Sequence, residues 1–380
     1  MFPIIEVGGR PRERGQAHGV QARGRIERSI ATYARLFAFC GIDWQGAQRR
    51  AAGYRELIGE LDAELLAEIE GIASGAGRNV DEILALNART EILPPNYPGE
   101  PHPDWKRIAS VNVAGGVPDW GECTAIAVKP TASATGGTLL AQNWDWLGAQ
   151  REALVVLRIR GAEGRSCLTL TEAGMLAKIG LNDCGFGVCL NILRSRDDGR
   201  RPGVPVHVLL RALLGCGSVA EAVALASKLS FGASSNVLCA DAGGDSVALE
   251  LSPTGLHAVR GAGATLCHTN HFVAPAAAAN QAALAPSLSS LPRLQRAEAI
   301  VAATRGRLGP DELKRLLRDE SDGFLSICRR PDPALAPEAC IESVASVIME
   351  LAAGVMHIAP DVPSCAEYVP VGLGTAALAA

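Results

Sequence analysis

The chain has 380 residues, which is enough for one large domain or two ordinary ones with a substantial buried core. Its 36 Lys and Arg against 40 Asp and Glu give a formal charge of −4, and the basic residues are scattered along the chain. This balance argues against nucleic acid or an anionic membrane as the partner and favours a small-molecule or short-peptide ligand.

The start of the chain carries no sign of export, because residues 1–7 lack a basic leader followed by a long apolar stretch. No run anywhere approaches the roughly 20 apolar residues that span a bilayer. We therefore expect a soluble, cytoplasmic protein.

Helical periodicity covers residues 12–89, where apolar side chains such as Ile26 and Ile30 recur three or four positions apart. A capping sequence at residues 79–82 then precedes a further helix. That helix carries three polar residues, Asn87, Arg89 and Glu91. We expect them to tie this N-terminal segment to the rest of the chain through a charge network.

Prolines crowd the next segment, between residues 94 and 118, and break any regular structure there. The result is a long irregular approach to Cys123, which we interpret as a processing loop. After Cys123 the chain turns to short apolar or β-branched runs separated by turn residues.

Strands are predicted at residues 124–128, 138–142, 154–159, 167–171, 175–181, 187–191, 237–240, 246–251 and 265–268. Helices are predicted in two pairs, at 205–214 and 219–229 and at 291–304 and 310–318. Because the helices are grouped between strand runs rather than alternating with single strands, we predict a layered sandwich of sheets and helices.

The eleven cysteines are odd in number, irregularly spaced and mostly flanked by small or apolar residues, which is typical of buried reduced thiols rather than disulfides. The absence of a CxxC pair argues against structural zinc. The chain has no G-x-G-x-x-G or Walker-type loop either. We expect no metal and no cofactor.

Cys123 is the candidate nucleophile, and a thiol needs a base to attack at neutral pH. Either His268 or His271 could reach it in space, as in an uncleaved Cys-His hydrolase. The other base arises if the Glu122–Cys123 peptide bond is cut, because the freed α-amino group has a pKa near 8 and belongs to the nucleophile itself. Such a cut would give chains 1–122 and 123–380.

Seven motifs occur in one order along nearly the whole chain. They are Gly8-Gly9-Arg10 with Gly15 to Gly19, Leu86-Asn87-Ala88-Arg89-Thr90-Glu91, Glu122-Cys123-Thr124, Gln142-Asn143-Trp144-Asp145, Ser234-Ser235-Asn236 with Asp241 and Glu250, His268-Thr269-Asn270-His271, and Ser290-Leu291-Pro292-Arg293. Together they resemble the isopenicillin N acyltransferase (acyl-CoA:6-aminopenicillanic acid acyltransferase) family of the N-terminal-nucleophile hydrolases.

The resemblance implies an α+β fold, a four-layer αββα sandwich of two antiparallel sheets. It implies a precursor that cuts itself before Cys123 and then acts through an acyl-enzyme on an amide or thioester. By that resemblance Cys123 is the nucleophile, Asp145 holds its N-terminal ammonium and Asn236 donates to the oxyanion. Supporting or substrate-binding roles fall to Asn143, His268, Asn270, Ser290 and Arg293.

The resemblance further implies that a helix-rich chain 1–122 and a catalytic chain 123–380 stay associated as one structural unit, with a homo-oligomer possible. One departure is that Glu122 precedes the nucleophile here, whereas the penicillin enzyme has Gly. Its carboxylate would either repel a forming thiolate or act as a local base. A member that only binds an acylated ligand is the alternative from another functional class.

Overall fold

The computed structural model describes residues 1–93, 123–161, 165–282, 289–304, 306–333, 337, 338 and 340–374. The expected processing loop and Glu122 lie outside the described residues.

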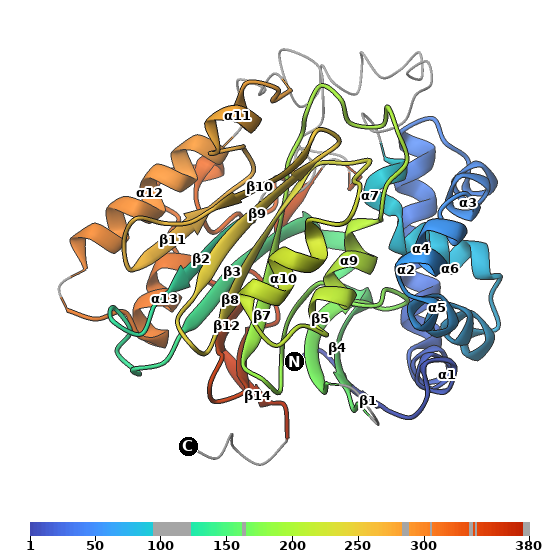
Figure 1. Ribbon diagram of the computed structural model, residues 1–380, viewed down its shortest axis with the longest axis horizontal. Helices are drawn as coiled ribbons and strands as arrows, with labels where there is room; N and C mark the ends of the chain where they lie inside the picture. The colour runs from blue at the N-terminus through green and yellow to red at the C-terminus, as the bar shows by residue number, and fades with distance from the viewer. Residues whose placement is uncertain are drawn as a thin grey trace.

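Two sheets form the centre of the molecule (Figure 1). The eight-stranded sheet has the order β1 (Ile4–Val7), β4 (Leu154–Ile159), β5 (Cys167–Glu172), β6 (Ile179–Asn182), β7 (Phe186–Ile192), β8 (Ser235–Asp241), β9 (Ser246–Ser252), β10 (Gly255–Val259). The six-stranded sheet has the order β11 (Thr265–His268), β2 (Cys123–Val128), β3 (Leu139–Leu147), β12 (Ile341–Glu350), β13 (Val355–Ala359), β14 (Val369–Gly372). The two sheets face one another, with β2 and β3 against β7.

Helices cover the outer faces of both sheets, so the expected four-layer αββα arrangement is confirmed (Figure 1). The six-stranded sheet is covered by α12 (Ser290–Ala303) and α13 (Pro310–Leu317), and the eight-stranded sheet by α9 (Val206–Leu213) and α10 (Val219–Ala226). Pairing is antiparallel as expected except between β1 and β4, which run parallel. This exception arises because the N-terminal strand joins the edge of the larger sheet.

The N-terminal segment after β1 is a helical layer that packs beside α9. Its helices are α1 (Pro11–Gln21), α2 (Arg23–Phe39), α3 (Trp44–Ala52), α4 (Arg55–Leu61), α5 (Ala63–Ala76), α6 (Val80–Asn87) and α7 (Arg89–Ile92). A separate short helix, α11 (Pro275–Ala278), follows β11. Glycines let α1 and α5 cross with backbones in contact: a side chain at Gly15 would meet the carbonyl of Glu68, and one at Gly71 that of Arg12.

Strand β2 shows why both faces of the smaller sheet are apolar. Cys123 and Ala125 point into the core between the sheets, whereas Ile126 and Val128 point into a second core under α12 and α13. A sheet covered on both faces needs apolar side chains on both. The continuous apolar run 124–128 therefore predicts this strand correctly.

Most predicted elements after Cys123 are confirmed to within two residues, but four sequence expectations need correction. The helix predicted at 219–229 ends at Ala226. The strand predicted at 138–142 continues to Leu147, because polar residues in its second half find partners across both layers. The strand predicted at 175–181 begins only at Ile179. Strands β1, β10, β12, β13 and β14 were not expected from the sequence.

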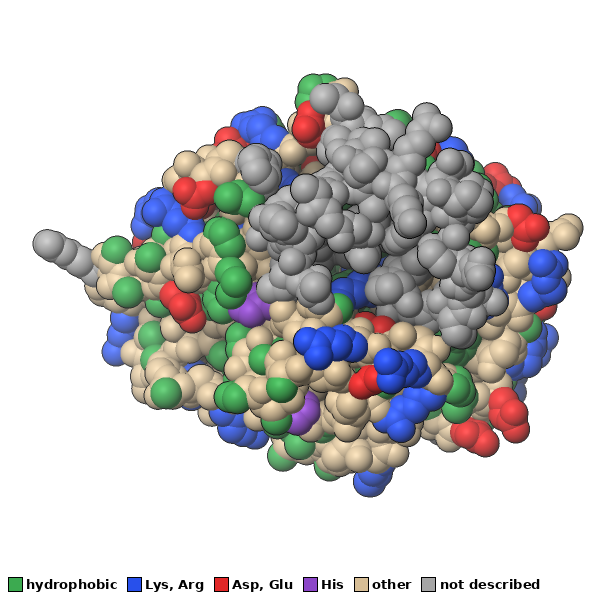
Figure 2. Space-filling view, turned by 90° about the horizontal axis from the view of Figure 1, so that it is seen from above, with side chains coloured by type: hydrophobic (Ala, Val, Ile, Leu, Met, Phe, Trp, Pro, Cys, Tyr) green, Lys and Arg blue, Asp and Glu red, His purple; other side chains and the backbone are tan. Residues whose placement is uncertain are grey.

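Charged side chains of both signs are interspersed on the face seen in Figure 2, with no broad patch of one sign among the described residues. No helix in the described part of the chain is long and apolar enough to cross a bilayer. Those same residues contain no group of three metal-ligating side chains.

Candidate active site

Cys123 is the first residue of β2 and lies directly across from Trp144 of β3. Neighbouring residues in antiparallel register point to the same face, and both side chains belong to the core between the sheets. Only 4% of Cys123 is exposed. The thiol therefore lies in a dry interior beside an indole ring.

The backbone of Cys123 is held by three side chains from three other elements. Its nitrogen donates to Oδ1 of Asn270 at 2.6 Å. Its carbonyl accepts from Nδ2 of Asn191 at 3.1 Å and from Nη1 of Arg293 at 2.7 Å. These contacts bring Asn270 and Arg293, two of the predicted supporting residues, to Cys123.

Arg293 links these contacts, because a guanidinium carries five N–H donors in a fixed fork. Besides the Cys123 carbonyl, it reaches Oγ1 of Thr124 at 3.0 Å, Oδ1 of Asn270 at 3.0 Å and Oγ of Ser289 at 2.8 Å. Its position in the first turn of α12 aims it at the end of β2, and it is 1% exposed. Arg293 is therefore a buried residue of the site and does not lie on a solvent-facing side of the helix.

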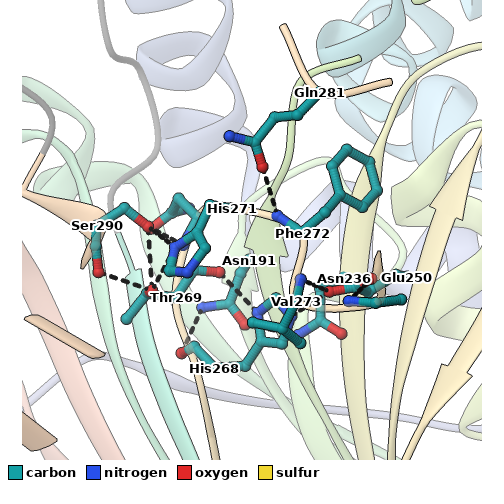
Figure 3. Close-up of polar contacts among 12 residues, drawn as sticks. Asn191, Asn236, Glu250, His268, Thr269, His271, Phe272, Val273, Gln281 and Ser290 are labelled. Atoms are coloured by element: carbon teal, nitrogen blue, oxygen red, sulfur yellow. Dashed lines mark hydrogen bonds and ion pairs between the residues drawn. The ribbon is translucent and has the colours of Figure 1, made fainter. Parts of the chain in front are cut away.

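Ser290 organises the loop that follows β11 (Figure 3). Its Oγ accepts from the backbone nitrogen of Asn270 at 2.8 Å, lies 2.7 Å from Nδ1 of His271 and donates to Oγ1 of Thr269 at 3.0 Å. These bonds fix Asn270 opposite the Cys123 nitrogen. Ser290 thus supports the site through Asn270.

The rings of His268 and His271 form hydrogen bonds with residues other than Cys123. His268 Nε2 lies 2.9 Å from Oε1 of Glu250, a carboxylate that also accepts from the backbone nitrogens of Val273 and Ala274 (Figure 3). Burial lowers the pKa of His271 to about 4, and its ring contacts Ser290. Among the described residues, no hydrogen bond joins either ring to Cys123.

Asp145 lies next to Trp144 on β3 but points to the opposite face, toward the helices. Its Oδ1 accepts from Oγ of Ser343 at 2.6 Å, whereas its buried Oδ2 has no hydrogen-bond partner in the described structure. Burial raises the pKa of Asp145 to about 7, and Arg293 and Ser343 oppose that rise. Asn143, on the same face, donates to the carbonyls of Leu317 and Ile327 and therefore anchors the helix layer.

Asn236 of β8 is connected to Cys123 only through a neighbouring residue. Its Nδ2 donates at 2.9 Å to Oδ1 of Asn191, its direct cross-strand partner on β7, and Asn191 in turn donates to the Cys123 carbonyl. The Oδ1 of Asn236 is buried and has no hydrogen-bond partner in the described part of the chain. Two amides therefore line this side of Cys123, although only Asn236 was expected there.

A buried ion cluster near Cys123 contains Arg89, which was expected to tie the N-terminal segment to the rest of the chain through charges, together with Lys178 and Glu172, which were not predicted. Lys178 lies with Nζ 3.8 Å from the centre of the Trp144 ring and 3.4 Å from Glu172 Oε2. Arg89 approaches the other oxygen of Glu172 at 3.4 Å, and Tyr33 donates to it at 2.5 Å. No sequence motif marks Lys178, which lies inside a run that reads as an apolar strand.

Burial raises the pKa of Cys123 to about 11. The Asp145 carboxylate adds to this rise, whereas the backbone amide of Asp145 and the positive charges of Lys178 and Arg293 oppose it. The thiol thus remains protonated at neutral pH unless a base takes its proton.

Comparison with known proteins gives one family. Residues 133–359 match the family model of acyl-coenzyme A:6-aminopenicillanic acid acyl-transferase. The chain is 31% identical over 339 residues to the acyl-coenzyme A:6-aminopenicillanic-acid-acyltransferase 40 kDa form of Emericella nidulans, a match that covers 86% of this chain and 84% of that protein.

Among solved structures, the chain is similar to a conjugated bile acid hydrolase mutant from Clostridium perfringens, with 11% identity, 66% of this chain and 92% of that chain covered, and a TM-score of 0.48. It is also similar to penicillin V acylase from Agrobacterium tumefaciens, with 14% identity and a TM-score of 0.43. That match covers 62% of this chain and 82% of the acylase chain.

Proposed function

The chain belongs to the acyl-coenzyme A:6-aminopenicillanic acid acyl-transferase family, and from that premise we propose that it is a self-processing enzyme in which Cys123 becomes an N-terminal nucleophile. Family membership makes it an acyltransferase or acylase. The proposed substrate is an amide or thioester of a small molecule or short peptide. Aromatic residues make up 4% of the chain, which favours an aliphatic acyl group over a stacked aromatic one.

One observation carries the proposal, a buried carboxylate oxygen near the start of β2 that lacks a hydrogen-bond partner in the described structure. Asp145 follows the cross-strand partner of Cys123, and its Oδ2 is buried with no partner in the described structure. A buried polar atom without a hydrogen-bond partner is costly. Cutting the bond before Cys123 creates an ammonium group on that residue, which supplies a cation near this carboxylate.

Processing begins with the thiol of Cys123. Its sulfur forms a bond to the carbonyl carbon of residue 122, and the C–N bond then breaks as the nitrogen takes a proton. Water hydrolyses the resulting thioester, leaving a carboxylate on residue 122 and a thiol on an N-terminal Cys123. Chains 1–122 and 123–380 stay together, because the helices of residues 11–92 share one hydrophobic core with the strands.

In the processed enzyme the α-amino group of Cys123, with an ordinary pKa near 8, takes the thiol proton. The thiolate attacks the acyl carbonyl, and water or an amine resolves the acyl-enzyme. Asp145 holds the ammonium form, while Asn236, turning its Nδ2 from Asn191, donates to the oxyanion.

Labelling with an aliphatic acyl thioester tests the chemistry. We expect a single acyl adduct on the larger fragment, mapped to Cys123, and loss of that adduct in Cys123→Ala. Turnover of amide or thioester substrates without any adduct at Cys123 would contradict the nucleophile. Binding without adduct or turnover would indicate a member of the family that only binds its acylated ligand.

A further inference from the structure

Lys178 reaches across the space between the two sheets to Trp144, the residue paired with Cys123. It stands just before β6 of the eight-stranded sheet, yet its Nζ lies over the ring of Trp144 on the six-stranded sheet. Trp144 is the cross-strand partner of Cys123, and the two side chains share one face. The charge of Lys178 and the thiol of Cys123 therefore interact electrostatically, each favouring the ionised form of the other.

Other charges around Lys178 act in opposite directions. Glu172 favours its ammonium form, whereas Arg89, which is bound to the same carboxylate, disfavours it. Tyr33 donates to Glu172, and the buried His207 of α9 also interacts with Lys178. Desolvation is the largest effect, and together these influences lower the pKa of Lys178 to about 7. A substantial fraction of Lys178 is thus a neutral amine at physiological pH.

In the uncut chain the α-amino base does not yet exist. The nitrogen of Cys123 is an amide that donates its hydrogen to Asn270 at 2.6 Å, so it has no basic lone pair for the thiol proton. The histidines are held by Glu250 and Ser290. Self-cleavage therefore needs a base other than the one used in turnover.

We propose that Lys178 is the general base of the first, self-cleaving reaction of Cys123. The inference rests on the proposed function and deepens it, since it assigns separate bases to maturation and to turnover. The same lysine returns the proton to the leaving nitrogen.

The self-cleaving reaction consumes only water, and each proton transfer in it can be assigned. Neutral Lys178 takes the proton from Sγ of Cys123, and the thiolate forms the S–C bond to the preceding carbonyl. When the C–N bond breaks, the Lys178 ammonium gives its proton to the nitrogen, which becomes the α-amine. Water then divides the thioester, its hydroxyl going to the acyl carbon and its proton to the sulfur.

The test measures the rate of chain cleavage in freshly purified Lys178→Arg and Lys178→Met. Arginine keeps the positive charge beside Glu172 but cannot act as a base, because its pKa exceeds 12. We expect both variants to fold, as judged by circular dichroism, and to cleave at least about 100-fold more slowly than wild type, the usual scale for a general base. Cleavage of Lys178→Arg at the wild-type rate would overturn the proposal and leave Lys178 as a fixed charge.

The pH profile of cleavage is a second readout, and the variants separate Lys178 from Asp145, whose pKa is also raised to about 7. A plateau above pH 7 that persists in Lys178→Arg would overturn the proposal. Wild-type cleavage should accelerate as Lys178 loses its proton and level off above pH 7, near its pKa of about 7. In the variants the rate should keep rising toward the pKa of Cys123, about 11, because only direct ionisation of the thiol remains. A wild-type profile that rises without a plateau toward pH 11 would contradict the proposal. Absence of wild-type cleavage at any pH would instead contradict the proposed function itself.

Discussion

The backbone nitrogen of Cys123 donates a hydrogen bond to the side-chain oxygen of Asn270 at 2.6 Å. The same oxygen accepts from Arg293 at 3.0 Å, and Arg293 also holds the carbonyl of Cys123. The backbone of Cys123 is therefore fixed at both its nitrogen and its carbonyl by buried groups. Such a rigid frame holds the first residue of β2 in one geometry.

Replacing Asp145 by Asn should abolish most acyl transfer while the fold remains. The amide keeps the volume and the contact with Ser343 but lacks the charge that would orient the ammonium of Cys123. We expect kcat to fall on the order of 100-fold or more, measured on processed protein with an acyl thioester. Asp311→Asn, at an exposed acid far from the site, is the matched control and should turn over normally.

The pH dependence of stability should report the burial of Asp145. Its pKa is raised to about 7 in the folded chain, above the ordinary value near 4, so the folded state holds a proton that the unfolded state releases. The stability contributed by this group is therefore lost as pH rises from about 4 to about 7.

We expect Asp145→Asn, in a Cys123→Ala background that cannot cleave, to remove this loss. As the pH rises from 5 to 7, the free energy of unfolding of the double variant should increase relative to that of Cys123→Ala alone by about 1 kcal/mol per pH unit. Urea unfolding at several pH values measures the difference. A constant difference across this range would contradict the assignment of a raised pKa.

Asn236→Ala should lower kcat on the order of 100-fold, because it removes the proposed oxyanion donor. The fair comparison is Asn182→Ala. Asn182 is also a buried amide, but it donates to the carbonyls of Leu214 and Cys216, and within the described part of the chain it makes no hydrogen bond to Cys123. It should cost stability without lowering kcat of the folded fraction. Equal kcat values in the two variants would remove Asn236 from the site.

The crossing of α1 and α5 should tolerate no side chain at its glycines. Gly71→Ala would push a methyl group into the Arg12 carbonyl, and we expect a loss of about 1 to 3 kcal/mol in the free energy of unfolding. Gly24→Ala, in α2, meets no atom within 4 Å and should instead stabilise by up to about 1 kcal/mol. Denaturant unfolding of both variants measures the two changes in the free energy of unfolding. Equal losses in the two variants would show that the close crossing of α1 and α5 does not cause the loss in Gly71→Ala.

Local patterns were sufficient for much of the fold. The strand at residues 154–159 and the helix pair after it follow from apolar runs and from helical periodicity, both of which are local properties. Strand β14, with a proline at its centre and partly exposed side chains, lacks such a pattern and is recognised only by its pairing with β13.

The site divides in the same way. Cys123, Asn270 and Arg293 come from three of the ordered motifs, and hydrogen bonds join them in the structure. Lys178 and Asn191 could not be found, because each lies in an apolar run and acquires its role only when two sheets stack. A polar residue in an otherwise apolar strand is the one local signal that they carry.

The intact mass of the purified chain tests the central claim most directly. We expect two fragments, 1–122 and 123–380, in place of the 39.6 kDa chain, with Cys123 as the new N-terminus. Cys123→Ala should remain a single chain, whereas Cys267→Ala, at a buried cysteine on β11, should still cleave. A wild-type protein that turns over acyl substrates while its mass stays at that of one uncut chain would contradict the account.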